Sequence, residues 1–168
     1  MGDGRYQLFQ YFRARLTAYL SKTVTGDGVW MIQADTIWRQ NLFTLGNLTS
    51  DPYREADVVF DREGDEGLLA SMIAGGYFYV RAASQWHGGE KFFDGVASYL
   101  QSYYATDNNV MSRQCLLQTG GARCAFFPYS LISNWRDEQK GEGADVPPLF
   151  QFDGGEGMFS ALQQLINE

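Results

Sequence analysis

The sequence predicts a single α+β domain, with a mixed or largely antiparallel sheet and about three amphipathic helices. Two observations predict this fold class. Apolar residues repeat at helical spacing near the N-terminus, in the middle and near the C-terminus of the chain, whereas runs of branched and aromatic residues typical of strands lie between them. A chain of 168 residues is long enough for one domain with a substantial core. Because no repeat or linker divides it, residues 1–168 are expected to form one unit.

Three segments have the spacing of an amphipathic helix, which packs its apolar stripe against other parts of the fold. The first runs from Arg5 to Lys22, the second over Lys91–Tyr104, and the third over Met158–Ile166. The closing segment is expected to pack on the sheet or on another subunit. The apolar positions of the first helix are Leu8, Phe9, Phe12, Leu16, Tyr19 and Leu20.

Strands are predicted where branched and aromatic residues dominate, over Val29–Leu45, Ala56–Phe60, Tyr77–Ala82 and Leu149–Phe152. Side chains alternate along a strand. Phe78 and Val80 are therefore expected on one face, and Tyr77, Tyr79 and Arg81 on the other.

The connections are predicted from glycine, proline and charged residues. An acidic turn is expected over Asp61–Asp65, and a short helix over Leu68–Ile73 that ends at Gly75–Gly76. Residues 136–148 are charged, contain glycine and end in Pro147–Pro148, so they are expected to form an exposed loop.

A β-hairpin is expected around Gly120–Gly121, with strands over Val110–Gln118 and Arg123–Tyr129. In that hairpin Cys115 and Cys124 would be diagonal neighbours on one face, at roughly 7 Å between their backbones. That spacing is at or beyond the limit of a relaxed disulfide, but it suits two thiolates that bind one zinc ion.

The candidate metal ligands are Cys115, Cys124 and His87, which is the only histidine of the chain. A tetrahedral zinc site would need a fourth ligand as well. The alternative is that both cysteines are small core residues, as free cysteines usually are. Their predicted neighbours on the same face, Leu117 and Phe126, favour this alternative.

Charge and composition exclude some classes of binding partner for this protein and indicate its compartment. The net charge is −7 with 13 basic residues, which argues against nucleic-acid binding and against an anionic membrane surface. No apolar run is long enough for a membrane span, and the N-terminus lacks the layout of a signal peptide. Two cysteines make no disulfide scaffold, so a reducing compartment, intracellular or in a virion, is expected.

Residues 86–127 resemble the vinyl-reductase-type small-molecule-binding domain. The resemblance is carried by Phe93–Leu100, then Cys115, Gly120 and Cys124–Phe126. It departs from the family where an acid precedes the first cysteine by three positions, because Ser112 stands there. The resemblance implies a zinc held by the cysteines beside a buried ligand pocket.

Two classes of function follow. The first is a non-catalytic structural or assembly subunit, such as a virion or tail component, that binds other protein subunits in a homo- or hetero-oligomer. It rests on 12 Phe, 10 Tyr and 4 Trp, which suit protein interfaces, and it needs no cofactor. The alternative is a ligand-sensing or pigment-related domain with zinc.

An enzyme is the third choice. The sequence has no phosphate-binding loop of the P-loop type and no nucleophile elbow. The 20 acidic residues are expected to lie mostly on the solvated surface, so no catalytic residue is assigned.

Overall fold

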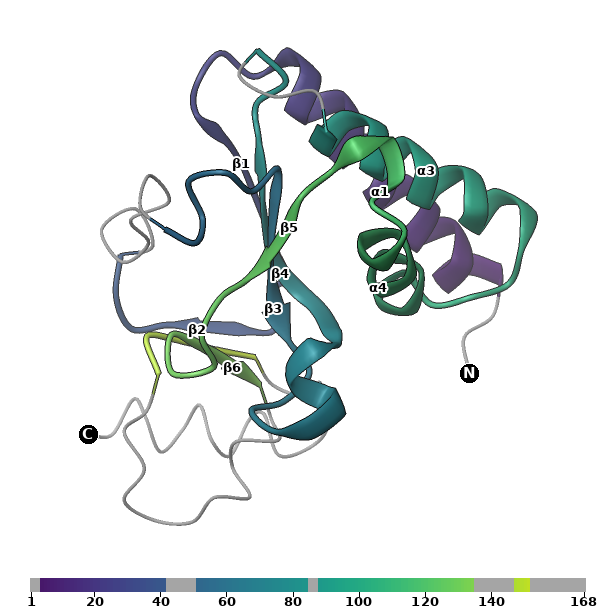
Figure 1. Ribbon diagram of the computed structural model, residues 1–168. Helices are drawn as coiled ribbons and strands as arrows, with labels where there is room; N and C mark the ends of the chain where they lie inside the picture. The colour runs from purple at the N-terminus through teal and green to yellow at the C-terminus, as the bar shows by residue number, and fades with distance from the viewer. Residues whose placement is uncertain (1–3, 42–50, 85–87, 135–146, 152–168) are drawn as a thin grey trace.

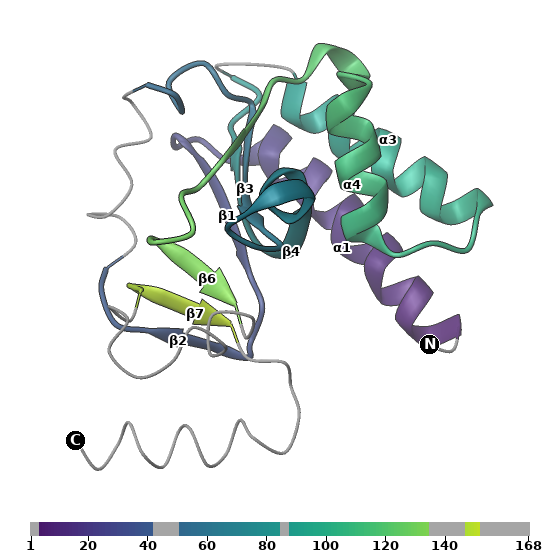
Figure 2. The same cartoon turned by 60° about the horizontal axis from the view of Figure 1, so that its bottom comes forward.

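The computed structural model describes residues 4–41, 51–84, 88–134 and 147–151. Within these ranges the predicted α+β class is confirmed. Three helices cover one face of a four-stranded sheet, and a small three-stranded sheet lies below the other face (Figures 1 and 2). The predicted closing helix, Met158–Ile166, and most of the predicted loop 136–148 lie outside the described residues.

The main sheet has the order β1-β4-β3-β5 and is mixed. Strand β4 runs antiparallel to both of its neighbours, β1 and β3, whereas β5 is parallel to β3. Strands β1, β3 and β5 therefore share one direction, and their carboxyl ends meet the amino end of β4 at one edge. The strands are β1 (Gly28–Ile32), β3 (Val58–Arg62), β4 (Ile73–Arg81) and β5 (Cys124–Phe126).

Alternation along β4 separates two cores, as predicted. Phe78 and Val80 pack with the helices, whereas Tyr77 and Tyr79 pack on the opposite face. All four side chains are at most 3% exposed. Layers on both faces explain why β4 carries almost no exposed residue.

The small sheet has the order β2-β7-β6, with β2 (Thr36–Trp38), β7 (Leu149–Gln151) and β6 (Ile132–Asn134). Asn134 of β6 connects the small sheet to the carboxyl end of β3. Its Nδ2 atom donates hydrogen bonds to the carbonyl oxygens of Arg62 (3.1 Å) and Glu63 (3.2 Å).

The three described helices are α1 (Gly4–Thr23), α3 (Gly88–Ser102) and α4 (Asp107–Leu116). Helix α3 confirms the predicted central helix, since Phe92, Phe93 and Val96 are buried against the sheet. A 3-10 helix, Gly67–Ser71, stands where a short helix was predicted. No helix within the described ranges is both long enough and apolar enough to cross a membrane.

Helix α1 lies where it was predicted, but it packs on its polar face rather than its apolar stripe. Its buried residues are small or hydrogen-bonded: Gln10, Arg13, Ala14, Thr17, Ala18 and Ser21. The hydroxyl groups of Thr17 and Ser21 donate hydrogen bonds to backbone carbonyl oxygens of the same helix, at 2.8 and 2.9 Å. These small side chains, and those hydrogen-bonded to the helix backbone, let α1 approach α3 closely. Most of the large apolar residues of α1 are therefore exposed to solvent.

The predicted hairpin around Gly120–Gly121 is wrong in its first strand. Helix α4 replaces it, with Asp107 in its first turn and Arg113 in its last, which suits the helix dipole. Both glycines have positive φ, 69° and 77°, and form a 3-10 turn after the helix. Only β5 remains as a strand, and it pairs in parallel with β3 instead of with a hairpin partner.

Candidate active site

The carboxyl ends of β1 and β3 bring together polar residues that are far apart in the sequence. In open α/β sheets, ligands bind beyond the carboxyl ends of parallel strands. Here that edge is flanked by the small sheet and by the first turn of α4 (Figure 2). The residues that meet there are Arg13, Gln33, Asp35, Asp61, Gly75, Gly76, Tyr77, Asp107, Asn108 and Gln151.

Asp61 occupies the centre of this edge. The sequence predicted an acidic turn that begins at Asp61, but Asp61 lies in β3 and is only 2% exposed. Its Oδ1 atom accepts the backbone N–H of Gly75 at 2.9 Å, and its Oδ2 atom accepts those of Gly76 and Tyr77, each at 3.0 Å. The carboxyl group therefore holds the start of β4 in place opposite the irregular pairing between Phe60 and Arg62.

Burial raises the pKa of Asp61 to about 7. The three backbone N–H groups and the nearby Arg13 guanidinium act in the opposite direction, because they favour the charged carboxylate. A carboxyl group with a pKa near neutral pH is unusual outside functional sites.

Gly75 makes room for α1 and α4 beside this carboxyl group. Its φ is +81°, and an added Cβ atom would lie 3.1 Å from Met111, 3.2 Å from Asn108 and 3.7 Å from the guanidinium of Arg13. Arg13 forms a buried ion pair with Asp107 at the start of α4. This ion pair joins α1 to α4, and both helices contact Gly75 at the edge of the sheet.

On the other side, Gly76 makes room for Gln151 of β7. An added Cβ atom on Gly76 would lie 2.0 Å from the Gln151 Oε1 atom. Gln151 donates a hydrogen bond to the Gln33 side chain, and the Gln33 backbone N–H donates to the Gly76 carbonyl at 3.1 Å. These contacts fix the segment after β1 against β4 and the small sheet.

Asp35 follows that segment and is only partly buried. Its Oδ1 atom is buried and has no hydrogen-bond partner among the described residues. Nearby, burial raises the pKa of the Tyr77 hydroxyl, with a smaller contribution from the charges of Asp61 and Asp35. An acceptor buried without a partner is costly unless a ligand satisfies it.

The arrangement suits a polar ligand rich in hydroxyl or phosphate groups. Carboxylates accept hydrogen bonds from hydroxyl groups, and one carboxylate together with substrate phosphates is a common way to hold Mg²⁺. Within the described ranges no three His, Cys, Asp or Glu side chains gather closely enough to form an all-protein metal site. A single carboxylate such as that of Asp35 can share a cation with a bound phosphate.

The structure places the predicted metal ligands elsewhere. Cys115 and Cys124 form a disulfide between the end of α4 and the start of β5, with 5.8 Å between their Cα atoms. Both pack against the helix-side core, and in this oxidised form neither offers a thiolate to a metal. His87 lies outside the described residues, so the metal site of Cys115, Cys124 and His87 stays a prediction for the reduced protein.

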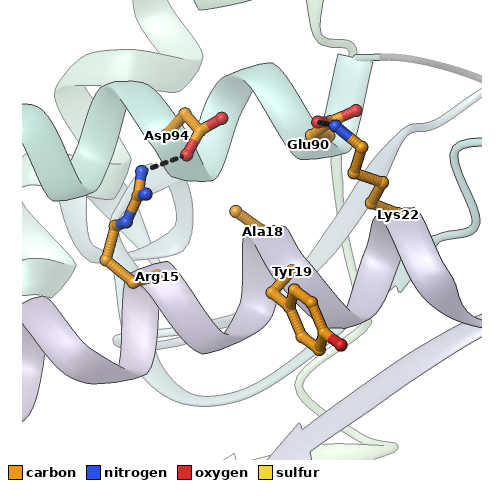
Figure 3. A pocket seen from close by; sticks show the side chains of 6 residues that line it. All are labelled: Arg15, Ala18, Tyr19, Lys22, Glu90 and Asp94. Carbon is orange, nitrogen blue, oxygen red and sulfur yellow. Dashed lines mark hydrogen bonds and ion pairs between the residues drawn. The ribbon is translucent and has the colours of Figure 1, made fainter.

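A hollow of about 180 Å³ lies between α1 and α3, away from this edge of the sheet. Figure 3 shows its two ends closed by ion pairs, Arg15 with Asp94 at 2.6 Å and Lys22 with Glu90 at 2.9 Å, with Ala18 between them. Because these exposed charges are already paired, the hollow marks a packing seam between helices. The edge of the sheet is the stronger candidate site.

Sequence reasoning missed the acids of this edge because it treated acidic residues as solvated surface. Two local signals were available. Asp61 directly follows the apolar run Val58–Phe60, and Asp35 follows the strand-like run Val29–Ile32 after two residues. An acid at the end of a buried strand points to the edge where ligands bind.

Comparison with solved structures finds the same fold in glycosyltransferases. One is a glycosyltransferase involved in the glycosylation of the major capsid of PBCV-1, with a TM-score of 0.66 and 10% identity over 94% of this chain and 77% of that chain. Another is the galactosyltransferase LgtC in complex with donor and acceptor sugar analogs, with a TM-score of 0.54 and 13% identity. That match covers 86% of this chain and 58% of LgtC. At these identities the likeness shows the fold alone.

A comparison with curated proteins finds no match. The comparison with protein families does, and it corrects the resemblance drawn from residues 86–127. The model of the nucleotide-diphospho-sugar transferase family matches residues 1–165, nearly the whole chain, and no vinyl-reductase family matches. The motif behind that resemblance is short and covers only about 40 residues. The chain belongs to the nucleotide-diphospho-sugar transferase family.

Proposed function

We propose that this protein transfers a glycosyl group from a nucleoside diphosphate sugar to an acceptor hydroxyl. The observation that carries the proposal is that the family match, over residues 1–165, includes every residue of the polar edge around Asp61. The fold shared with two glycosyltransferases supports it.

In such a reaction, the bond between the sugar's anomeric carbon and the diphosphate oxygen breaks. The acceptor oxygen forms the new bond, its proton leaves, and the nucleoside diphosphate departs with the electron pair. The protein must therefore hold the diphosphate, orient the sugar and exclude water. Each of these tasks needs fixed polar groups at one place, which the edge of the sheet supplies.

Asp35 is our candidate for the diphosphate side, where its buried Oδ1 atom would help hold a divalent cation that neutralises the departing phosphates. Asp61 is a positioning residue because it fixes the backbone of Gly75–Gly76, and Gln151 is one because it packs on Gly76 and donates to Gln33. Asn108 lies beside Gly75 at the start of α4 and is suited to contact the sugar.

The family assignment corrects the assembly-subunit function and its alternative, the ligand-sensing domain. Some of the aromatic residues on which the first interpretation rested form the two cores of the protein, whereas others on α1 and directly after α3 are exposed. The Trp30 ring lies 5.4 Å from that of Tyr79 and 5.2 Å from that of Phe127, between centroids, and Phe60 makes tilted contacts with Phe78, Phe92 and Phe93. Part of the aromatic content is therefore needed to fill two cores and does not by itself indicate a subunit interface.

The test is release of nucleoside diphosphate from a panel of uridine and guanosine diphosphate sugars, with Mg²⁺ or Mn²⁺ and with candidate sugar acceptors. Asp35→Asn is expected to lower the rate roughly 100-fold or more, because it removes the charge that holds the cation. Binding of the free nucleoside diphosphate by calorimetry gives a second measure that needs no acceptor.

Asp27→Asn is the matched control, since Asp27 precedes the opposite end of the same strand and is exposed. It should leave both measurements unchanged. The proposal fails if the full chain neither binds any nucleoside diphosphate nor cleaves any donor, or if the two variants behave alike.

A further inference from the structure

The outer side of helix α1 carries a large apolar surface. We define the α1 apolar face as six residues that lie within about 120° of one another around the helix, at about 100° per residue: Leu8, Phe9, Phe12, Leu16, Tyr19 and Leu20. Leu8, Phe9, Phe12 and Tyr19 are 65, 52, 57 and 63% exposed, and Leu16 and Leu20 are partly buried. Contiguous exposed apolar surface of this kind marks an interaction site.

This face lies opposite the side of α1 that packs within the chain. The buried residues Gln10, Ala14 and Ser21 lie about 160–180° around the helix from Phe12. In Figure 3, Tyr19 points away from α3. The packing of α1 on α3 and on the sheet therefore leaves the α1 apolar face open to a partner.

The α1 apolar face has the same pattern in both directions along the helix. Its six residues follow one another at steps of 1, 3, 4, 3 and 1 positions. A contact between two identical copies across a twofold axis needs a surface that is complementary to itself. When the helix is turned end for end about position 14, each apolar position falls on another apolar position, in the pairs Leu8–Leu20, Phe9–Tyr19 and Phe12–Leu16.

We propose that this protein forms a twofold-symmetric dimer, in which the α1 apolar faces of two copies pack against each other with their helices antiparallel. Phe12 of each copy then lies against the partner's Leu16, close to the twofold axis. Side chains at steps of three and four positions interdigitate when two helices pack, and the α1 apolar face has these steps at its centre.

The exposed area of the face is sufficient for a weak dimer. A large side chain has about 200 Å² of surface, and four of these are half to two-thirds exposed, which gives roughly 500 Å² on each copy. Two copies would bury roughly 1,000 Å² through these four side chains alone. Specific interfaces begin at about 1,000–1,200 Å², so we expect association in the micromolar range rather than a permanent dimer.

The charges beside the face do not oppose this pairing. Arg15 and Lys22 are paired with Asp94 and Glu90 of α3, at 2.6 and 2.9 Å. Each ion pair is neutral overall, so it adds little repulsion between two copies. The net charge of −7 instead disfavours an anionic lipid surface as the occupant of the face.

Sedimentation velocity of the full chain at concentrations from about 1 to 100 µM tests the dimer. The natural chain is expected to pass from monomer to dimer over this range. Phe12→Glu should raise the dimer Kd at least about 30-fold, because it places a charge at the centre of the apolar contact in both copies. Leu116→Glu is the matched control, since it adds the same charge to a leucine of α4 that is 86% exposed, and it should leave the Kd unchanged.

Folding of the variants is checked separately. Phe12 is 57% exposed in the single chain, so Phe12→Glu should keep the melting temperature of the natural monomer when both are measured well below the dimer Kd.

Cysteine cross-linking measures the direction of the two helices and does not depend on Phe12→Glu. An equal mixture of Phe12→Cys and Leu16→Cys chains is expected to form about fivefold more interchain disulfide under mild oxidation than either variant alone. Antiparallel pairing brings these two positions together, whereas two copies of position 12 are about 6 Å further apart along the axis, and a disulfide needs Cα atoms within about 7 Å. Peptide mass mapping separates the new bond from Cys115–Cys124.

Four results would overturn the proposal. A natural chain that stays monomeric at 100 µM would show that the face does not bind a second copy. Dimers that Leu116→Glu dissociates and Phe12→Glu does not would place the interface at α4. Stronger cross-linking of Phe12→Cys alone than of the mixture would replace the antiparallel arrangement by a parallel one. A monomer that binds anionic lipid vesicles, and loses this binding in Phe12→Glu, would assign the face to a lipid surface.

Discussion

Asp61 combines two opposing influences on one carboxyl group. Three backbone N–H donors favour its charged form, while burial favours the neutral form and prevails, so that its pKa is raised from 3.8 to about 7. Between these two values the folded protein binds a proton that the unfolded chain does not. The free energy of unfolding therefore contains a contribution from Asp61 that is present at low pH and is lost as pH rises toward 7.

This contribution predicts a pH-dependent difference between the natural protein and Asp61→Asn. From pH 4 to about pH 8, the stability of the natural protein should fall by roughly 4 kcal/mol relative to the variant, and the difference should be flat above that range. Urea unfolding at several pH values measures it. A difference that stays constant or changes in the opposite direction contradicts the raised pKa.

Gly76 is the residue at which the site tolerates least added volume. Gly76→Ala should displace Gln151, because the new Cβ atom would meet its Oε1 atom at 2.0 Å. Gln151 is also held by Gln33, so the expected cost is about 1–3 kcal/mol for the lost hydrogen bond.

Gly26→Ala is the control, since an added Cβ atom there meets nothing within 4 Å. Urea unfolding of both variants, with the affinity for nucleoside diphosphate measured beside it, checks the prediction. Equal stability of the two variants would show that the Gln151 side chain can move away from Gly76 without a loss of stability.

At the scale of elements, the ion pairs that attach α1 to α4 and to α3 lie in different environments. Arg13 and Asp107 join α1 to α4 with side chains only 10% exposed, whereas Arg15 and Asp94 join α1 to α3 with side chains 54% and 46% exposed. Breaking a buried pair leaves an uncompensated charge, but an exposed pair contributes little.

Arg13→Ala should therefore cost about 3–5 kcal/mol of stability, and Arg15→Ala at most about 1 kcal/mol. Thermal and urea unfolding compare the two variants directly. Similar losses from both would mean that Asp107 is solvated when Arg13 is absent, and that α4 is not held through this pair.

At the scale of the whole molecule, the single domain and the loop 136–148 remain predictions from the sequence. The loop lies between β6 and β7, which are parallel neighbours in the small sheet beside the candidate site. Charged and glycine-containing segments are the preferred sites of proteolysis. Limited digestion should cut first within 136–148 and should slow when a nucleoside diphosphate is bound. If the protease cuts first at another site, residues 136–148 are protected by a contact with a partner.

The sequence by itself determined the fold class, the positions of the first and central helices and the two faces of β4. These follow from local periodicity, which survives in the folded protein: Phe78 and Val80 alternate with Tyr77 and Tyr79 across the sheet as the spacing requires. Periodicity failed at α1, because Ala14 and Ala18 pack closely against α3 and turn the larger apolar residues outward.

Only the tertiary structure decided where the site lies. Arg13, Asp61, Gly75 and Asp107 are spread over most of the chain, and they meet because β1 and β3 run in the same direction and α1 and α4 pack on one face. Strand direction and helix packing depend on contacts between distant segments. The pairing of Cys115 with Cys124 was decided in the same way, since a helix stands where local turn residues predicted a strand. Local patterns specify which elements form, whereas long-range packing decides which side chains meet.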